Sequence, residues 1–280
     1  MIAEKRKLIK WTDTLDHKQS VTINEEEEWV ALEINLKINI NGKELVRFAC
    51  SPIDCKDLAI GFLFTEGIIS CLGEIDFLTY NETTNLVEIT LNEKSKFNHL
   101  DWQTARTMSS GCGQGVISKL EYKRKNLIPI SFKVNTNPRC LSQLFHHLKT
   151  HSEWYEKTGC IHQVTLFNND ETVIIREDIG RHNAVDKVIG AALQCNLDFE
   201  ETVMNCSGRL SSDMILKAAK ARIPIIVSRA APTSLAIDIA DELGMTLIGF
   251  ARGKRMNVYT HPNRISLKEQ LDEMKIPELT

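Results

Sequence analysis

Hydrophobic and polar residues alternate strictly between positions 30 and 40, which is the period of a half-buried β-strand. One face of this segment carries six aliphatic side chains: Val30, Leu32, Ile34, Leu36, Ile38 and Ile40. The dipeptide Asn41-Gly42 follows, and residues 45–48 supply an apolar return strand. Because Asn-Gly is the strongest short turn signal between such runs, the pattern predicts a β-hairpin.

The next segment has the composition of a helix start. Ser51, Pro52 and Asp54 match an N-cap, a first-turn proline and an acidic third position. We expect this helix to run to about Glu66 and to end at Gly67. Residues 86–91 predict a further strand, so the first hundred residues indicate a small α+β unit.

From residue 160 the pattern is sharper. Residues 161–167 and 172–176 predict a hairpin, and apolar spacing over 184–193 predicts an amphipathic helix. Strands and helices then alternate, over 202–206, 211–221, 223–228, 233–243 and 245–250. Short loops between alternating strands and helices are typical of a parallel α/β sheet.

These patterns predict an α/β protein with an α+β N-terminal unit. We expect a small N-terminal domain over 20–106, a mobile loop over 107–128, and a C-terminal α/β domain over 129–280 that binds a cofactor. The chain has 280 residues, which a prior of about 150 residues per domain divides into two.

Charge and hydropathy exclude several classes of function. The 34 Lys and Arg residues nearly balance the 37 Asp and Glu residues, and the net charge is -3. Such a balance gives no general attraction to nucleic acid or to an anionic membrane. There is no apolar run long enough for a transmembrane helix and no secretory signal pattern, so we expect a cytoplasmic protein with reduced thiols.

The eight cysteines contain no Cys-x-x-Cys pair, so the usual zinc-ribbon and dithiol spacings are missing. We interpret Cys50 and Cys55, which flank the helix start, as residues without a chemical role, and Cys50, Cys71, Cys140 and Cys195 as small buried hydrophobic residues. His146, His147 and His151 lie on a predicted helix, where a solvated face is favoured over a zinc site. No metal site is expected.

Small and basic residues follow three consecutive predicted strands. They are Ser207, Gly208 and Arg209, then Ser228, and then Phe250, Ala251, Arg252, Gly253, Lys254 and Arg255. Ligands of open α/β sheets bind outside the carboxyl ends of strands, and arginine suits phosphate oxygens. The arrangement favours a phosphorylated or nucleotide-like ligand. The alternative is a set of ordinary tight loops with solvated arginines.

Two more segments carry side chains that could bind a ligand or react. Arg181 and His182 lie in a polar cluster before a helix, where they either face a ligand or belong to a capped, solvated turn. Cys112 lies between glycines in a loop of small residues over 109–115. An exposed thiol in such a loop can ionise and attack sulfur or carbonyl centres. The alternative is an ordinary surface loop in which Cys112 has no reactive role.

Several of these segments resemble motifs of one family. They read Glu-Asp-Ile-Gly-Arg-His-Asn-Ala-Val-Asp-Lys over 177–187, Ser-Gly-Arg over 207–209, Ala-Pro-Thr over 231–233 and Gly-Phe-Ala-Arg-Gly over 249–253, with Thr-Gly-Cys-Ile-His over 158–162. The chain resembles the FdhD/NarQ family of formate dehydrogenase accessory sulfurtransferases over about residues 50–260.

The resemblance implies a sulfur carrier. Its members accept sulfane sulfur from a cysteine desulfurase as a persulfide and pass it to the bis(guanylyl-molybdopterin) form of the molybdenum cofactor, Mo-bis-MGD, for formate dehydrogenase. By loop position Cys112 would carry the persulfide, and residues 250–255 would contact the cofactor. The resemblance also implies a homodimer and a second domain similar to the cytidine deaminase fold without its zinc ligands.

One departure from the family pattern matters. Many members carry Cys-Gly-x-Cys-Gly in the loop, whereas Gly115 stands at the second cysteine position here. A relay through one thiol remains chemically sound, but a cofactor-binding chaperone without sulfur transfer is the alternative. A zinc deaminase is disfavoured because its His-x-Glu and Pro-Cys-x-x-Cys motifs are missing from the sequence.

Overall fold

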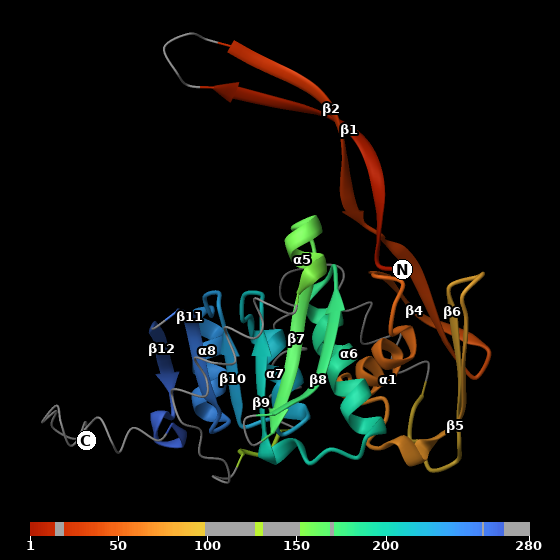
Figure 1. The fold of residues 1–280 in the computed structure, drawn as a ribbon. Coiled ribbons are helices and arrows are strands. Elements are labelled where there is room, and N and C mark those ends of the chain that lie inside the picture. The colour runs from red at the N-terminus through yellow and green to blue at the C-terminus, as the bar shows by residue number, and fades with distance from the viewer. Residues whose placement is uncertain (15–19, 99–126, 131–151, 169–170, 254, 266–280) are drawn as a thin grey trace, which may run out of the picture.

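The computed structural model describes residues 1–14, 20–98, 127–130, 152–168, 171–253 and 255–265. Three sheets organise this part of the chain: a two-stranded arm, a four-stranded sheet and a six-stranded sheet (Figure 1). Residues 107–126 of the predicted loop, with Cys112, lie outside the described residues. So do Lys254 and the three histidines at 146, 147 and 151.

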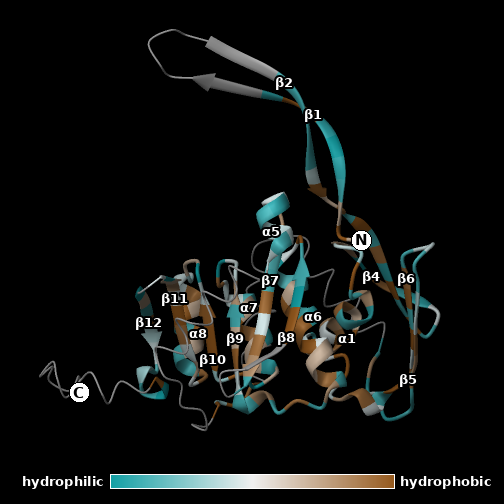
Figure 2. Ribbon diagram, viewed as in Figure 1, coloured by the Kyte–Doolittle hydropathy of each residue, from teal (hydrophilic) through white to brown (hydrophobic). Residues whose placement is uncertain are grey.

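The arm consists of β1 (Ala3–Thr14) and β2 (Ser20–Ala31), which pair antiparallel from Ala3↔Ala31 to Thr14↔Ser20. It stands away from the body in Figure 1, and Figure 2 shows that much of it is hydrophilic. The single strand predicted over 30–40 was wrong, because β2 ends at Ala31 and the next strand begins at Ile34. Its regular alternation crosses from one sheet into another.

The four-stranded sheet has the order β4-β3-β6-β5. Its strands are β3 (Ile34–Ile40), β4 (Lys43–Cys50), β5 (Ile75–Asn81) and β6 (Leu86–Leu91), with the 3₁₀ turn η1 (Leu72–Glu74) before β5. Asn41 and Gly42 both have positive φ, 49° and 75°, which confirms the predicted hairpin. Apolar side chains of β3, β4 and β6 pack against α1 (Cys55–Thr65).

Helix α1 ends as expected, with Gly67 at φ 74° just beyond it. Its predicted start was wrong: the N-cap is Asp54, not Ser51. Ser51 is fully buried and serves the other half of the protein, since its backbone N–H donates to Asp178 Oδ2 (3.0 Å) and its Oγ accepts from the Ile179 N–H (3.1 Å). Ser51 therefore bonds to residues far along the chain and does not cap α1.

The six-stranded sheet has the order β12-β11-β10-β9-β7-β8. Its strands are β7 (His162–Asn168), β8 (Glu171–Asp178), β9 (Thr202–Cys206), β10 (Ile225–Ser228), β11 (Thr246–Arg252) and β12 (Arg255–Thr260). Strands β9, β10 and β11 are parallel, which confirms the predicted alternation, whereas β7, β8 and β12 run antiparallel to their neighbours.

The helices beside this sheet are α5 (Glu153–Thr158), α6 (Arg181–Gln194), α7 (Ser212–Lys220) and α8 (Ser234–Glu242), with 3₁₀ turns η2 (Phe199–Glu201) and η3 (Pro262–Arg264). Helices α6, α7 and α8 bury their apolar faces against one side of the sheet. The mixed architecture agrees with the predicted fold class, while the likeness to the cytidine deaminase fold stays a prediction.

Helices α1 and α6 join the two units by a close backbone contact. A Cβ added to Gly61 would lie 1.8 Å from the carbonyl oxygen of Asp186, and one added to Gly190 would lie 2.0 Å from that of Asp57. Side chains cannot fit there, so both helices need glycine at the crossing. The two predicted domains therefore share a packed interface, and their exact boundaries stay predictions.

A buried ion pair lies beside this crossing. Lys217 Nζ lies 2.8 Å from Asp186 Oδ2, and it also donates to Thr65 Oγ1 at 3.0 Å. All three residues are buried, and they come from α7, α6 and α1 respectively. None of the helices that the structure describes is long and apolar enough to cross a membrane.

Candidate functional site

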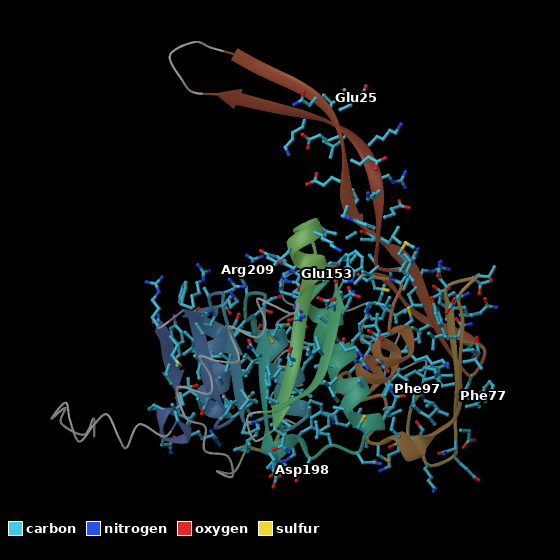
Figure 3. The ribbon with its side chains drawn as sticks, in the orientation of Figure 1. Glu25, Phe77, Phe97, Glu153, Asp198 and Arg209 are labelled. Carbon is cyan, nitrogen blue, oxygen red and sulfur yellow. The ribbon has the colours of Figure 1, made fainter. Side chains whose placement is uncertain are left out.

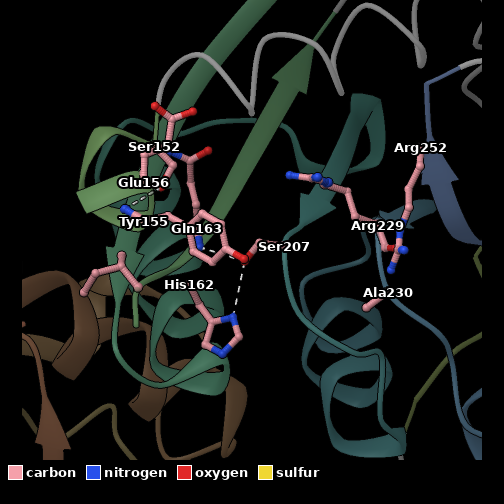
Figure 4. A pocket seen from close by; sticks show the side chains of 10 residues that line it. Ser152, Tyr155, Glu156, His162, Gln163, Ser207, Arg229, Ala230 and Arg252 are labelled. Carbon is pink, nitrogen blue, oxygen red and sulfur yellow. Dashed lines mark hydrogen bonds between the residues drawn. The ribbon is translucent and has the colours of Figure 1, made fainter. Parts of the chain in front are cut away.

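A cavity of about 420 Å³ opens at the carboxyl ends of β9, β10 and β11, where the sequence predicts a ligand. Figure 4 shows its walls, with residues of α5 and the start of β7 on one side and two arginines on the other. The lining residues come from five segments: Ser152, Tyr155, Glu156, Ile161, His162, Gln163, Ser207, Arg229, Ala230 and Arg252.

The two arginines are tied together at one wall. Arg252 Nε donates to the carbonyl oxygen of Arg229 at 2.8 Å, which links the end of β11 to the loop after β10. Phe250 supports the same link, since it adopts a φ of 50° and its N–H donates to the Ala230 carbonyl at 3.0 Å. This wall presents forked donors that suit the oxygens of a phosphate group.

Ser207 and Ser228 fix the loops at the centre of the site. Ser207 Oγ accepts from the Gln163 N–H at 3.0 Å and lies 3.3 Å from His162 Nδ1. Ser228 is fully buried, where its Oγ donates to the Gly208 carbonyl at 2.7 Å and accepts from the Ala230 N–H at 2.9 Å. Ser228 thus positions the loops and does not line the cavity.

A second basic cluster adjoins the cavity around Gly208. A Cβ on Gly208 would lie 3.1 Å from His162 Nδ1 and 3.2 Å from Arg181 Cβ, so the backbone fills the space between them. His182 Nε2 lies 3.3 Å from Ser211 Oγ. Burial lowers the pKa of both histidines, and the charge of Arg181 lowers each further. The lowered pKa favours the neutral imidazole at both positions, although the Asp213 carboxylate opposes this shift at His182.

The segment 177–187 divides into two roles. Arg181 lies beside Gly208, and His182 lies beside Ser211. Asp178 faces the interior, where its Oδ2 lies 2.6 Å from Lys187 Nζ and its Oδ1 accepts from Asn183 Nδ2 at 2.9 Å. Asn183 also donates to the carbonyl oxygen of Ala49. Much of this polar motif is therefore a structural junction between the two units.

The other predicted site residues are dispersed. Ala251 is fully buried in an apolar cluster with Val227 and Ile248, so it supports the sheet. Arg255 is exposed at the start of β12, and Gly253 has a φ of 58° in the turn before it. Arg209 is exposed at the same end of the sheet as Glu153 of α5 (Figure 3). Of the described members of the predicted cofactor-binding set, Ser207 and Arg252 line the cavity itself.

Sequence reasoning missed His162, Gln163 and the contribution of α5. Helix α5 has only six residues and follows a weakly patterned region, so periodicity could not mark it. His162 belongs to the segment 158–162, and that motif was the available signal. Among the described residues, no group of three His, Cys, Asp or Glu side chains is arranged to hold a metal ion.

Comparison with known proteins decides the family. The model of the FdhD/NarQ family matches residues 31–266. The chain belongs to this family. It is 36% identical over 237 residues to the sulfur carrier protein FdhD of Bacillus pumilus, covering 85% of this chain and 90% of that protein. With the FdhD of Wolinella succinogenes the identity is 37% over 247 residues, covering 87% and 85%.

A solved structure shows the same fold. It comes from Desulfotalea psychrophila and is described as a formate dehydrogenase accessory protein. It superposes with a TM-score of 0.73 at 26% identity, covering 95% of this FdhD/NarQ chain and 100% of the solved one.

Proposed function

We propose that this FdhD/NarQ protein is a sulfur carrier that serves formate dehydrogenase. A cysteine desulfurase would supply sulfane sulfur, and Cys112 would accept it as a persulfide while the donor recovers a thiol. The cargo that receives the sulfur would be Mo-bis-MGD, which makes the protein a sulfurtransferase. Relatives named as sulfur carriers and a neighbour described as a formate dehydrogenase accessory protein support this role.

The cavity carries the proposal for the cargo. Arg229 and Arg252 offer guanidinium donors at one wall, which fits the phosphate groups of a guanine dinucleotide. Glu156 and Gln163 at the opposite wall offer oxygen acceptors, which fit the N–H groups of a guanine base. A homodimer would offer two such cavities to the two nucleotides of one cargo.

The sulfur step predicts a covalent product on one residue. After incubation with a cysteine desulfurase and free cysteine, intact-protein mass spectrometry should show one added sulfur atom that a thiol reductant removes. The Cys112→Ala variant should show none, because only a thiolate attacks the sulfane sulfur. The Cys160→Ala variant is the matched control and should gain sulfur as the wild type does. Sulfur on the Cys112→Ala variant would refute the assignment.

The nucleotide step predicts a loss of affinity at the cavity wall. The Arg252→Ala variant should bind GDP roughly 10- to 100-fold more weakly, because a hydrogen bond from a charged group contributes about 1.5–3 kcal/mol. Isothermal titration calorimetry measures the change. Arg47→Ala, an exposed arginine of the four-stranded sheet, is the control and should bind GDP unchanged. Equal affinity in the Arg252 and Arg47 variants would exclude this wall as the phosphate site.

A binding chaperone without sulfur transfer is the second candidate. The observation that favours it is Gly115 at the position of the second loop cysteine. In a strain that lacks the native protein, this alternative expects Cys112→Ala to restore formate dehydrogenase activity while Arg252→Ala does not. The sulfur carrier expects both variants to fail.

A further inference from the structure

The base of the arm lies against α5, the short helix that forms part of the cavity wall (Figure 1). Trp29 of β2 packs edge-on against Trp154 of α5, with the ring centroids 5.6 Å apart and 75° between the ring planes. Lys157 Nζ lies over both rings, 5.5 Å from the Trp29 centroid and 5.0 Å from the Trp154 centroid. Trp29 therefore joins the arm to α5 through an aromatic pair and a shared ammonium group.

An apolar cluster continues this contact to the cavity. Ile2 and Ala3 at the base of the arm are buried, and they form one cluster with Ile161. Trp29 and Trp154 pack against the same cluster. Ile161 is itself one of the residues that line the cavity. The arm thus packs against the cavity wall at two places, through α5 and through Ile161.

Helix α5 depends on contacts with other elements for its position. It has six residues and none of them is buried, and a helix of this length is marginal in isolation. Ser152 provides one support, since its Oγ accepts from the Tyr155 N–H at 3.3 Å and donates to Glu177 Oε1 at 2.9 Å. The pair with Trp29 provides another. Both supports fix the helix that carries Tyr155 and Glu156, two lining residues of the cavity.

We propose that Trp29 is a positioning residue for the cavity: the arm holds α5 in place, and with it the wall that Tyr155 and Glu156 supply. The affinity of the cavity for its ligand then depends on the arm. A wall that is in place for only part of the time weakens binding in proportion to the time it is displaced. This role rests on the proposed function, from which GDP is taken as the ligand.

Hydrogen exchange of α5 tests the structural half of this role without a ligand. In the full-length Trp29→Ala variant, the amides of residues 153–159 should exchange faster than in the wild type, because the helix opens more often. Glu156 and Gly159 are the reporting positions, since their N–H groups form backbone hydrogen bonds of this helix. Val30→Ala is the matched control, because Val30 is the next residue of β2, points to the opposite face and is 45% exposed. Its exchange should equal that of the wild type.

Binding of GDP tests the functional half. In isothermal titration calorimetry Trp29→Ala should bind GDP roughly 2- to 10-fold more weakly, the factor that an aromatic pair contributes beyond the burial of its rings. Trp154→Ala should show a similar loss. The double variant should lose little more than either single variant, because both substitutions remove the same contact. Trp29→Phe should recover part of the affinity, since it keeps an aromatic ring at this position.

The two measurements separate this role from the proposed function. If the wild type does not bind GDP, the proposed function fails, and the exchange of α5 alone decides whether Trp29 holds the helix. The positioning role is overturned if the wild type and Trp29→Ala bind GDP equally. It is also overturned if the amides of α5 exchange at the same rate in Trp29→Ala and Val30→Ala.

Discussion

The Gly61→Ala variant is expected to lose at least about 3 kcal/mol of unfolding free energy, at the upper end of overpacking effects. The reason is the crossing of α1 and α6, where the added methyl group would lie 1.8 Å from the carbonyl oxygen of Asp186. Backbone cannot move aside as a side chain can, so the two helices must separate. Alanine favours an isolated helix over glycine by about 1 kcal/mol, which is too small to compensate.

Urea unfolding followed by circular dichroism measures this effect. Gly73→Ala is the matched control, because a Cβ there would meet only Cys71 Sγ at 3.6 Å, an ordinary contact. The control should unfold at nearly the wild-type midpoint. If Gly61→Ala were as stable as Gly73→Ala, the close approach of the two helices would be refuted.

The Lys217→Met variant is expected to lose about 3–5 kcal/mol, because it leaves the Asp186 carboxylate buried without its cation. Burial already raises the pKa of Asp186, and Lys217 opposes that rise. Removing Lys217 therefore raises the pKa further. A group whose pKa is raised by folding stabilises the native state at low pH and loses that contribution as pH rises. The variant should be more stable at about pH 5 than at about pH 8, relative to the wild type.

Guanidinium unfolding at both pH values tests this expectation. The double variant Asp186→Asn/Lys217→Met removes both charges and should recover part of the lost stability. Its stability relative to the wild type should also change less with pH than that of Lys217→Met. If the stability of Lys217→Met changed with pH no more than that of the wild type, the charge of Asp186 would not be the cause of the lost stability.

The sequence predicted elements whose signals are local. The Asn41-Gly42 hairpin and the alternation over 202–250 depend on turn residues and on neighbouring apolar positions, and both were confirmed. The start of α1 was wrong because Ser51 binds Asp178, a residue 127 positions away. No local pattern reports such a partner.

The candidate site shows the same division. The strand ends predicted a ligand cavity, and Ser207 and Arg252 lie in it. In the segment 177–187, Arg181 and His182 were interpreted as facing a ligand or as part of a capped, solvated turn, whereas Asp178, Asn183 and Lys187 of the same segment are buried against the first unit. Polarity alone cannot separate a ligand site from a buried junction, because both require charged and hydrogen-bonding side chains.

The junction between the two units also constrains how the chain folds during synthesis. Thr65 Oγ1 forms its hydrogen bonds with Asp186 and Lys217 only after these residues have been synthesised, and they are 121 and 152 residues further along the chain. At a translation rate of about 5–20 residues per second, the first unit emerges from the ribosome roughly 6–30 seconds before its partners. During that interval the face of α1 that meets α6 stays uncovered on the nascent chain, so the native contacts of the first unit are completed only after the second unit has been synthesised.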